Sequence, residues 1–281
     1  MKTNTENLLV AVVSTTATSN KGDNIAKALA GAQEACGKGA DWVCLPEMFA
    51  YHGPYENLWE NAEFEDGPLN QKLAQFARKN NVILFAGSAG ERPQGSNDGK
   101  IFNTQYVFGR DGSLIAKYRK THLFNLLDAG GQKLYCESDG YLAGDRTVTL
   151  AVDGWQIGLA TCYDLRFPDF FSKLNQGPKL DCLMIPSAFT LQTGMYHWSV
   201  LLRARAIEHL CYVIAPNQVG QHSPGKASYG HALIVDPWGT IIADTANRPS
   251  TAIATISKDT IASCRSQLPS LNNQRPELYR N

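Results

Sequence analysis

The stretch GLATCYDLRFPDFF, residues 158–171, begins as an apolar strand and ends in charged residues. Cys162 stands at the border, and Asp164, Arg166 and Asp169 follow it within seven residues. The pattern indicates a buried strand that opens into a polar loop at its carboxyl end. In layered α/β proteins ligands gather at such strand ends, because loops meet there over a rigid floor. We therefore expect an α/β fold with Cys162 at a ligand-binding edge.

Strands of the same kind recur along the chain. The stretches 8–15 (LLVAVVST), 42–47 (WVCLPE) and 82–90 (VILFAGSAG) predict buried strands, with helices between them that begin at Asp23 and Pro68. Two hairpins are then predicted, 102–109 with 114–124 and 147–152 with 155–163. After them we expect strand 182–188, helix 196–210 and strand 211–218. A last hairpin pairs 231–235 with 240–244. Because crossovers alternate with hairpins, we expect a mixed sheet or two sheets, with the helices outside.

Composition favours one domain that handles a small molecule. The 281 residues are 43% hydrophobic, enough for one large core, and no linker divides them, so residues 1–281 are predicted to form a single domain. The 26 basic and 26 acidic residues balance, which argues against a nucleic-acid or anionic-membrane partner. The Pro-containing polar tail 268–281 is expected to be an extended arm on this subunit or on a partner.

The cysteines indicate a reducing compartment. There are seven, at positions 36, 44, 136, 162, 182, 211 and 264, an odd number in a long chain, so we expect free thiols and a cytoplasmic protein. No pair has C-x-x-C spacing and no histidines cluster with them, so no metal site is predicted. The cysteines at 36, 44, 182 and 211 are interpreted as small core residues. The run LLVAVV loosely imitates a signal peptide, but Glu6 and the helix after it favour a first core strand. No apolar run approaches the roughly 20 residues of a membrane span.

Three residues of complementary chemistry each follow an apolar strand: Glu47, Lys120 and Cys162. A thiol attacks well only when it is deprotonated, so a carboxylate such as Glu47 would serve as its base while the Lys120 ammonium stabilises a thiolate. Lys120 and the backbone N–H of Tyr163 are also placed to stabilise an oxyanion. Glu137, on the loop between the lysine and cysteine strands, is expected to orient Lys120 or to hold a leaving amine.

Ordinary structural roles stand beside these functional ones. Asp164 and Arg166 would also form an ion pair at the start of a helix beginning at Pro168. A papain-like cysteine–histidine pair would need His122 or His197 as its partner.

Other catalytic motifs are absent. The G-x-S-x-G pattern fails at FAGSAG, residues 85–90, and no P-loop or G-x-G-x-x-G opens a helix, so no nucleotide cofactor is predicted.

Four motifs in order, LPEMF (45–49), YRKTHLF (118–124), CES (136–138) and CYDLRFPD (162–169), resemble the nitrilase, or carbon-nitrogen hydrolase, superfamily over nearly the whole chain. The resemblance implies a four-layer α-β-β-α sandwich and maps a Glu-Lys-Cys triad onto Glu47, Lys120 and Cys162, with Glu137 as the auxiliary glutamate. It also implies a homodimer or larger homo-oligomer and a reaction that requires no metal or organic cofactor.

Further motifs, among them PSAFTLQTG (186–194) and YGHALIVDPWG (229–239), resemble the amidases of deaminated glutathione and, slightly less, the omega-amidases. The branch implies hydrolysis of an amide of a 2-oxo acid through a cysteine thioester. Arg166 would bind a substrate carboxylate, and Phe189 and Thr190 would line the pocket. The resemblance is weaker over the loop 125–136, which is expected to border the pocket and influence substrate choice. A nitrilase acting on C≡N and a non-catalytic binding protein remain as alternatives.

Overall fold

Two β-sheets lie face to face in the computed structural model, which describes residues 5–95 and 99–279. The first sheet has the order β17 (Ser250–Ser257), β1 (Asn7–Ser14), β2 (Trp42–Cys44), β3 (Ile83–Glu91), β4 (Ile101–Phe108) and β5 (Leu114–Arg119), with β8 (Tyr141–Leu142) paired to β4. The second has the order β16 (Ile241–Asp244), β15 (Leu233–Val235), β12 (Tyr212–Ala215), β11 (Cys182–Met184), β10 (Trp155–Leu159) and β9 (Val148–Val152).

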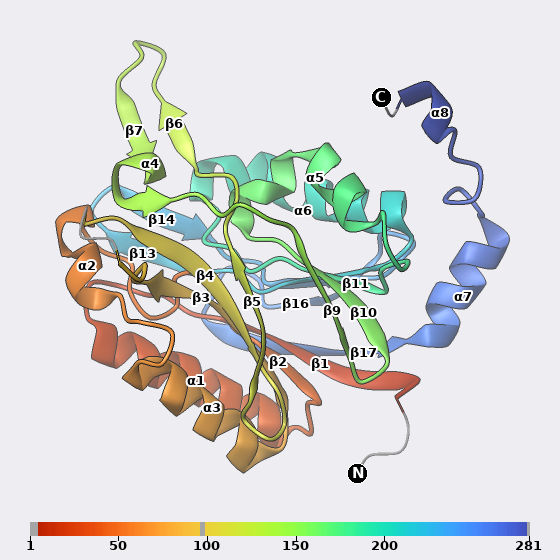
Figure 1. Ribbon diagram of the computed structural model, residues 1–281, viewed down its shortest axis with the longest axis horizontal. Coiled ribbons are helices and arrows are strands. Elements are labelled where there is room, and N and C mark those ends of the chain that lie inside the picture. The colour runs from red at the N-terminus through yellow and green to blue at the C-terminus, as the bar shows by residue number, and fades with distance from the viewer. Residues whose placement is uncertain (1–4, 96–98, 280–281) are drawn as a thin grey trace.

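Helices cover the outer faces of both sheets (Figure 1). Helices α1 (Lys21–Gly37) and α3 (Pro68–Asn80) lie on the first sheet, and α5 (Pro168–Leu174) and α6 (Leu191–His209) on the second. The predicted four-layer α-β-β-α sandwich is confirmed. The shorter elements are η1 (Tyr55–Asn57), α2 (Leu58–Asn61), β6 (Asn125–Leu127), β7 (Lys133–Cys136), α4 (Glu137–Gly140), η2 (Cys162–Arg166), β13 (Val219–Ser223), β14 (Lys226–Tyr229), α7 (Lys258–Gln267) and α8 (Pro276–Tyr279).

Alternation along β1 explains why the layers form. Val10 and Val12 belong to the core cluster that includes the space between the sheets, whereas Ala11 and Val13 belong to the cluster under α1 and α3. Successive side chains of a strand point to opposite faces, so an almost continuous apolar strand is buried on both sides. Each large apolar side chain removed from water contributes about 1.5–3 kcal/mol. The apolar runs of the sequence therefore require a layer above and a layer below.

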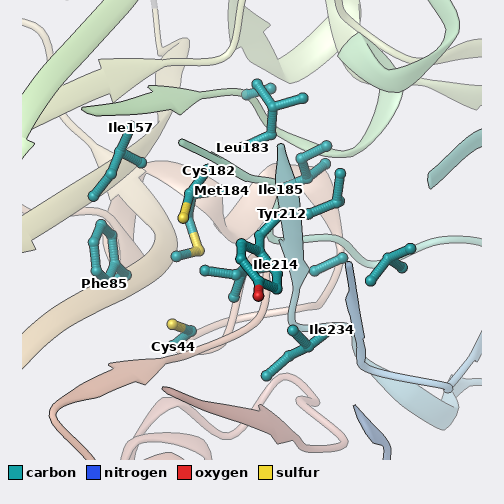
Figure 2. Packing of buried hydrophobic residues seen from close by; sticks show 14 of the residues in the cluster. Cys44, Phe85, Ile157, Cys182, Leu183, Met184, Ile185, Tyr212, Ile214 and Ile234 are labelled. Atoms are coloured by element: carbon teal, nitrogen blue, oxygen red, sulfur yellow. The ribbon is translucent and has the colours of Figure 1, made fainter. Parts of the chain in front are cut away.

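Cysteines take part in this packing. Figure 2 shows Cys182 and Met184 of the second sheet pointing toward Cys44 and Phe85 of the first, with Leu183 turned the other way. The prediction of core thiols is confirmed for the fully buried cysteines at 44, 182 and 211, whereas Cys36 on α1 is only half-buried. All seven cysteines are free.

Some boundaries differ from the predicted ones for identifiable reasons. Helix α1 begins at Lys21 rather than Asp23, because the Asn20 side chain accepts a hydrogen bond from the Asp23 backbone and caps the helix. The helix predicted over 196–210 begins earlier, at Leu191. The tail expected to be extended over 268–281 contains the one-turn helix α8, and its residues 280–281 lie outside the described part. Within the described ranges, no helix combines the length and apolar character needed to cross a membrane.

Candidate active site

Three strand ends bring Glu47, Lys120 and Cys162 to one end of the sandwich. Glu47 follows β2 and Lys120 follows β5, both in the first sheet, while Cys162 follows β10 in the second. The Lys120 backbone N–H still donates to the carbonyl of Asn103 at 2.9 Å, which extends the β4–β5 pairing to the lysine. Relative exposure is 0% for Lys120, 1% for Glu47 and 9% for Cys162. The two sheets therefore enclose the three groups together.

Glu47 is held by donors on both carboxylate oxygens. Its Oε1 accepts from Lys120 Nζ at 3.0 Å and from Asn103 Nδ2 at 2.8 Å. Its Oε2 accepts from the backbone N–H of Ala188 at 2.7 Å. These contacts fix the carboxylate in one orientation, as a general base requires.

Lys120 lies between two carboxylates. Its Nζ is 2.8 Å from Glu137 Oε2 and 3.0 Å from Glu47 Oε1, and Glu137 Oε2 also accepts from the Phe124 backbone N–H at 2.8 Å. Burial alone would lower the pKa of Lys120, but Glu137 and Glu47 outweigh it and raise the pKa well above its usual value. The ammonium is therefore charged, and of the two roles expected for Glu137 the contacts favour orienting Lys120.

Cys162 occupies a strained backbone position. Its φ of 48° lies in the left-handed region that non-glycine residues seldom adopt, and its backbone N–H donates to the Pro186 carbonyl at 3.0 Å. Strain of this kind is typical of functional sites, where the surrounding structure enforces it.

The surroundings of the Cys162 thiol favour its neutral form. Burial raises its pKa well above the usual range, Glu47 raises it further, and the opposing effect of Lys120 is smaller. Burial and the carboxylate thus outweigh the lysine and disfavour a thiolate before substrate binds.

Asp164 supports the loop that carries Cys162. Its fully buried carboxylate accepts from the Tyr118 hydroxyl at 2.6 Å, the Thr161 N–H at 2.8 Å and the His122 N–H at 3.0 Å. The expected Asp164–Arg166 ion pair is wrong, since these donors, two of them some 40 residues away in sequence, occupy the carboxylate instead.

The histidines of the papain-like alternative have other partners. His122 Nδ1 lies 2.7 Å from Asp164 Oδ1, and the His122 ring stacks on Phe167 at 3.8 Å. His197 Nδ1 lies 3.2 Å from the Arg166 guanidinium. Each therefore has a neighbour that accounts for its position without the thiol.

A small pocket opens beside Cys162. It is lined by Phe124, Cys162, Tyr163, Arg166, Ala188, Phe189, Thr190 and Thr193. All four residues expected to bind substrate, Tyr163, Arg166, Phe189 and Thr190, thus lie around one cavity. The Arg166 guanidinium packs 5.1 Å from the centre of the Phe189 ring, and within residues 5–95 and 99–279 its polar neighbour is His197 rather than a carboxylate. The catalytic pocket, as we call it, carries a positive charge available to an acidic substrate.

Sequence reasoning missed two groups that hold Glu47. The Asn103 side chain, fully buried in β4, was detectable as an amide inside an apolar strand, since buried polar groups need partners. The Ala188 N–H is a backbone group, and no side-chain pattern identifies it.

Known proteins that are similar to this chain identify its family. The family model described as carbon-nitrogen hydrolase matches residues 9–266. The chain belongs to the carbon-nitrogen hydrolase family. The predicted superfamily and the prediction of an enzyme that hydrolyses carbon-nitrogen bonds in amides are confirmed.

This carbon-nitrogen hydrolase has similar relatives along nearly its whole length. It is 40% identical over 278 residues to the deaminated glutathione amidase of Rattus norvegicus, covering 96% of this chain and 83% of that protein. It is 34% identical over 272 residues to omega-amidase NIT2 of Mus musculus, covering 96% of each. The solved structure of the C. elegans NitFhit protein superposes with a TM-score of 0.91 at 34% identity, covering 98% of this chain and 66%, slightly under two thirds, of that one.

Proposed function

We propose that this hydrolase, as a single domain over residues 1–281, cleaves the amide bond of deaminated glutathione or of a similar 2-oxo acid through a thioester on Cys162. The observation that carries the proposal is the enclosure of Glu47, Lys120 and Cys162 at one end of the sandwich, beside the Arg166 guanidinium, whose polar neighbour is His197 rather than a carboxylate. The similarity to the rat deaminated glutathione amidase supports the substrate.

The first half of the reaction forms the thioester. Cys162 Sγ attacks the amide carbon while its proton passes to Glu47, which avoids a free thiolate in a site that disfavours one. The Lys120 ammonium and the Tyr163 N–H stabilise the oxygen as it gains negative charge. When the C–N bond breaks, the leaving nitrogen takes the proton from Glu47.

The second half regenerates the enzyme. Glu47 removes a proton from water, and the hydroxyl oxygen attacks the thioester carbon. The C–S bond then breaks, the acid product leaves, and Glu47 returns the proton to the sulfur. Glu137 keeps Lys120 in place throughout. The proton balance closes on these side chains, and the proposal includes no metal or organic cofactor.

Omega-amidase activity is the second candidate, supported by the 34% identity to NIT2. Hydrolysis of deaminated glutathione and of 2-oxoglutaramate by the purified protein, each beside Cys162→Ala, separates the two. Rapid turnover of deaminated glutathione that the variant lacks is the expected result. Ammonia released from 2-oxoglutaramate, with deaminated glutathione untouched, would establish omega-amidase activity instead. A nitrile substrate tests the nitrilase alternative, and inactivity on all of these would favour a binding protein.

A homo-oligomer is part of the proposal. Helix α6 exposes a row of apolar side chains, with Tyr196 at 71% and Val200 at 62% exposure, and Trp238 nearby is 46% exposed. Exposed apolar patches of this kind mark interaction surfaces, and a second copy would cover this one. We expect light scattering to give the mass of at least a dimer and Val200→Glu to reduce it. A monomeric wild type would refute this part.

A cytoplasmic location is also proposed, because the seven cysteines are all free and reduced thiols persist in that compartment. Fractionation of cells that make the protein tests it.

A further inference from the structure

A second hollow adjoins the catalytic pocket. It is larger than that pocket and lies between the β6–β7 hairpin, the start of α6 and the β13–β14 turn. Its lining includes Leu134, Tyr135, Thr190, Met195 and Lys226. Thr190 lines the catalytic pocket as well, so the two spaces meet at this residue. We call the second space the outer groove.

The β6–β7 hairpin connects the outer groove to the reacting centre. The hairpin projects from the body of the molecule on the side of β14 (Figure 1). Its Tyr135 ring lies 5.6 Å from the Phe124 ring, and Phe124 packs 5.0 Å from Tyr163, next to the nucleophile. The hairpin therefore borders the space outside the reacting carbonyl.

Lys226 places a positive charge in the groove without a carboxylate beside it. Its Nζ lies 5.5 Å from the centre of the Tyr55 ring and 5.6 Å from that of Tyr135. In the described ranges no acidic side chain lies within ion-pair distance of it, although Lys133 of the hairpin pairs with Asp139 at 2.9 Å. A half-buried ammonium held between two aromatic rings is oriented and available for an anion.

We propose that the outer groove binds the leaving group of the substrate, a peptide-like amine with a free terminal carboxylate, and that Lys226 pairs with this carboxylate. This inference rests on the proposed function and deepens it. Deaminated glutathione carries one carboxylate on the acyl side of the scissile amide and another at the end of the amine side. Arg166 in the catalytic pocket faces the first, and Lys226 in the outer groove faces the second. The leaving group of 2-oxoglutaramate is ammonia, which is too small to reach the groove.

The test compares three substrates: deaminated glutathione, its C-terminal carboxamide and 2-oxoglutaramate. The wild type is expected to prefer the acid to the carboxamide. In Lys226→Met the kcat/KM for the acid should fall about tenfold relative to that for the carboxamide, as for the loss of one partly exposed charged hydrogen bond. Lys226→Arg should restore most of the preference. Lys133→Met, which removes a paired lysine of the neighbouring hairpin, should keep the wild-type ratio.

Other outcomes overturn the inference. An equal loss on the acid and the carboxamide in Lys226→Met, with Lys226→Arg no better, would make Lys226 structural, and a wild type that ignores the terminal carboxylate would exclude its recognition. In both cases turnover of deaminated glutathione persists and the proposed function stands. A wild type that hydrolyses 2-oxoglutaramate but neither peptide, or none of the three, would refute the deaminated glutathione assignment and the role of the groove together.

Discussion

Two clusters of cations and carboxylates meet at β5, and only one of them buries its cation beside a thiol. Arg119 and Lys117 pair with Glu91 at 2.6 and 3.0 Å, much as the next residue along, Lys120, pairs with Glu137 and Glu47. The first two cations remain 33% and 34% exposed, whereas the Lys120 side chain is 0% exposed and lies beside a thiol and a pocket. Ion pairing is common to both clusters, so the burial of Lys120 next to a thiol is what distinguishes the candidate active site.

Replacing Glu47, the proposed general base, should have the largest effect on kcat. We expect Glu47→Gln to lower kcat on the order of a thousandfold, since a positioned base contributes that much and Glu47 moves a proton in both halves of the reaction. Glu91→Gln is the matched control, and steady-state kinetics of both variants gives the comparison. Comparable loss of kcat in Glu91→Gln would break the distinction between the clusters.

Removing a cation should reduce the stability of the protein more in the Lys120 cluster than in the Glu91 cluster. Lys120→Met leaves Glu47 and Glu137 uncompensated in a buried site and should cost about 3–5 kcal/mol in the free energy of unfolding. Lys117→Met loses the contacts of a partly exposed ammonium with Glu65 and Glu91, but Arg119 still pairs with Glu91, so it should cost about 1 kcal/mol or less. Urea unfolding measures both, and equal costs would show that enclosure does not govern the energetics.

Replacing Arg166, which lines the pocket beside Cys162, should have a smaller effect, on substrate binding. Because lysine lacks the planar fork of the guanidinium, Arg166→Lys should raise KM for acidic amides by about tenfold and for neutral amides less. Initial rates on a 2-oxo acid amide and a neutral amide test this. An equal rise for both would indicate that Arg166 is structural.

The ion pairs of Glu91 with Arg119 and Lys117 should make the stability of the protein depend on pH in the acid range. Burial alone would raise the pKa of Glu91, but hydrogen bonds from Arg119, Thr104 and Lys117 outweigh it and lower the pKa. A lowered folded-state pKa adds stability above the ordinary glutamate value of 4.5, and this is lost as pH falls through the folded value. Stability of the wild type should therefore drop below about pH 4.5 more steeply than that of Glu91→Gln, by about 1 kcal/mol. Urea midpoints between pH 5 and 3 decide this, and parallel curves would contradict it.

The sequence was sufficient to predict the layers and the three residues that the fold brings together. Buried strands leave long apolar runs, and Glu47, Lys120 and Cys162 each follow one of them. The β6–β7 and β13–β14 hairpins were missed, because strands of three to five residues are too short to show a clear alternation. The partners of Asp164 were missed for another reason. The nearest opposite charge in sequence is Arg166, but the fold brings Tyr118 from 46 residues away, and only the three-dimensional packing specifies that contact.

Intact-protein mass spectrometry on a reaction with deaminated glutathione, quenched within the first turnovers, shows whether Cys162 carries the acyl group. Peptide mapping locates the adduct, and Cys162→Ala serves as the control. We expect an adduct with the mass of the acyl half of the substrate on Cys162 and none in the variant. Turnover by Cys162→Ala at the wild-type rate, or an adduct on another of the seven cysteines, would contradict this expectation.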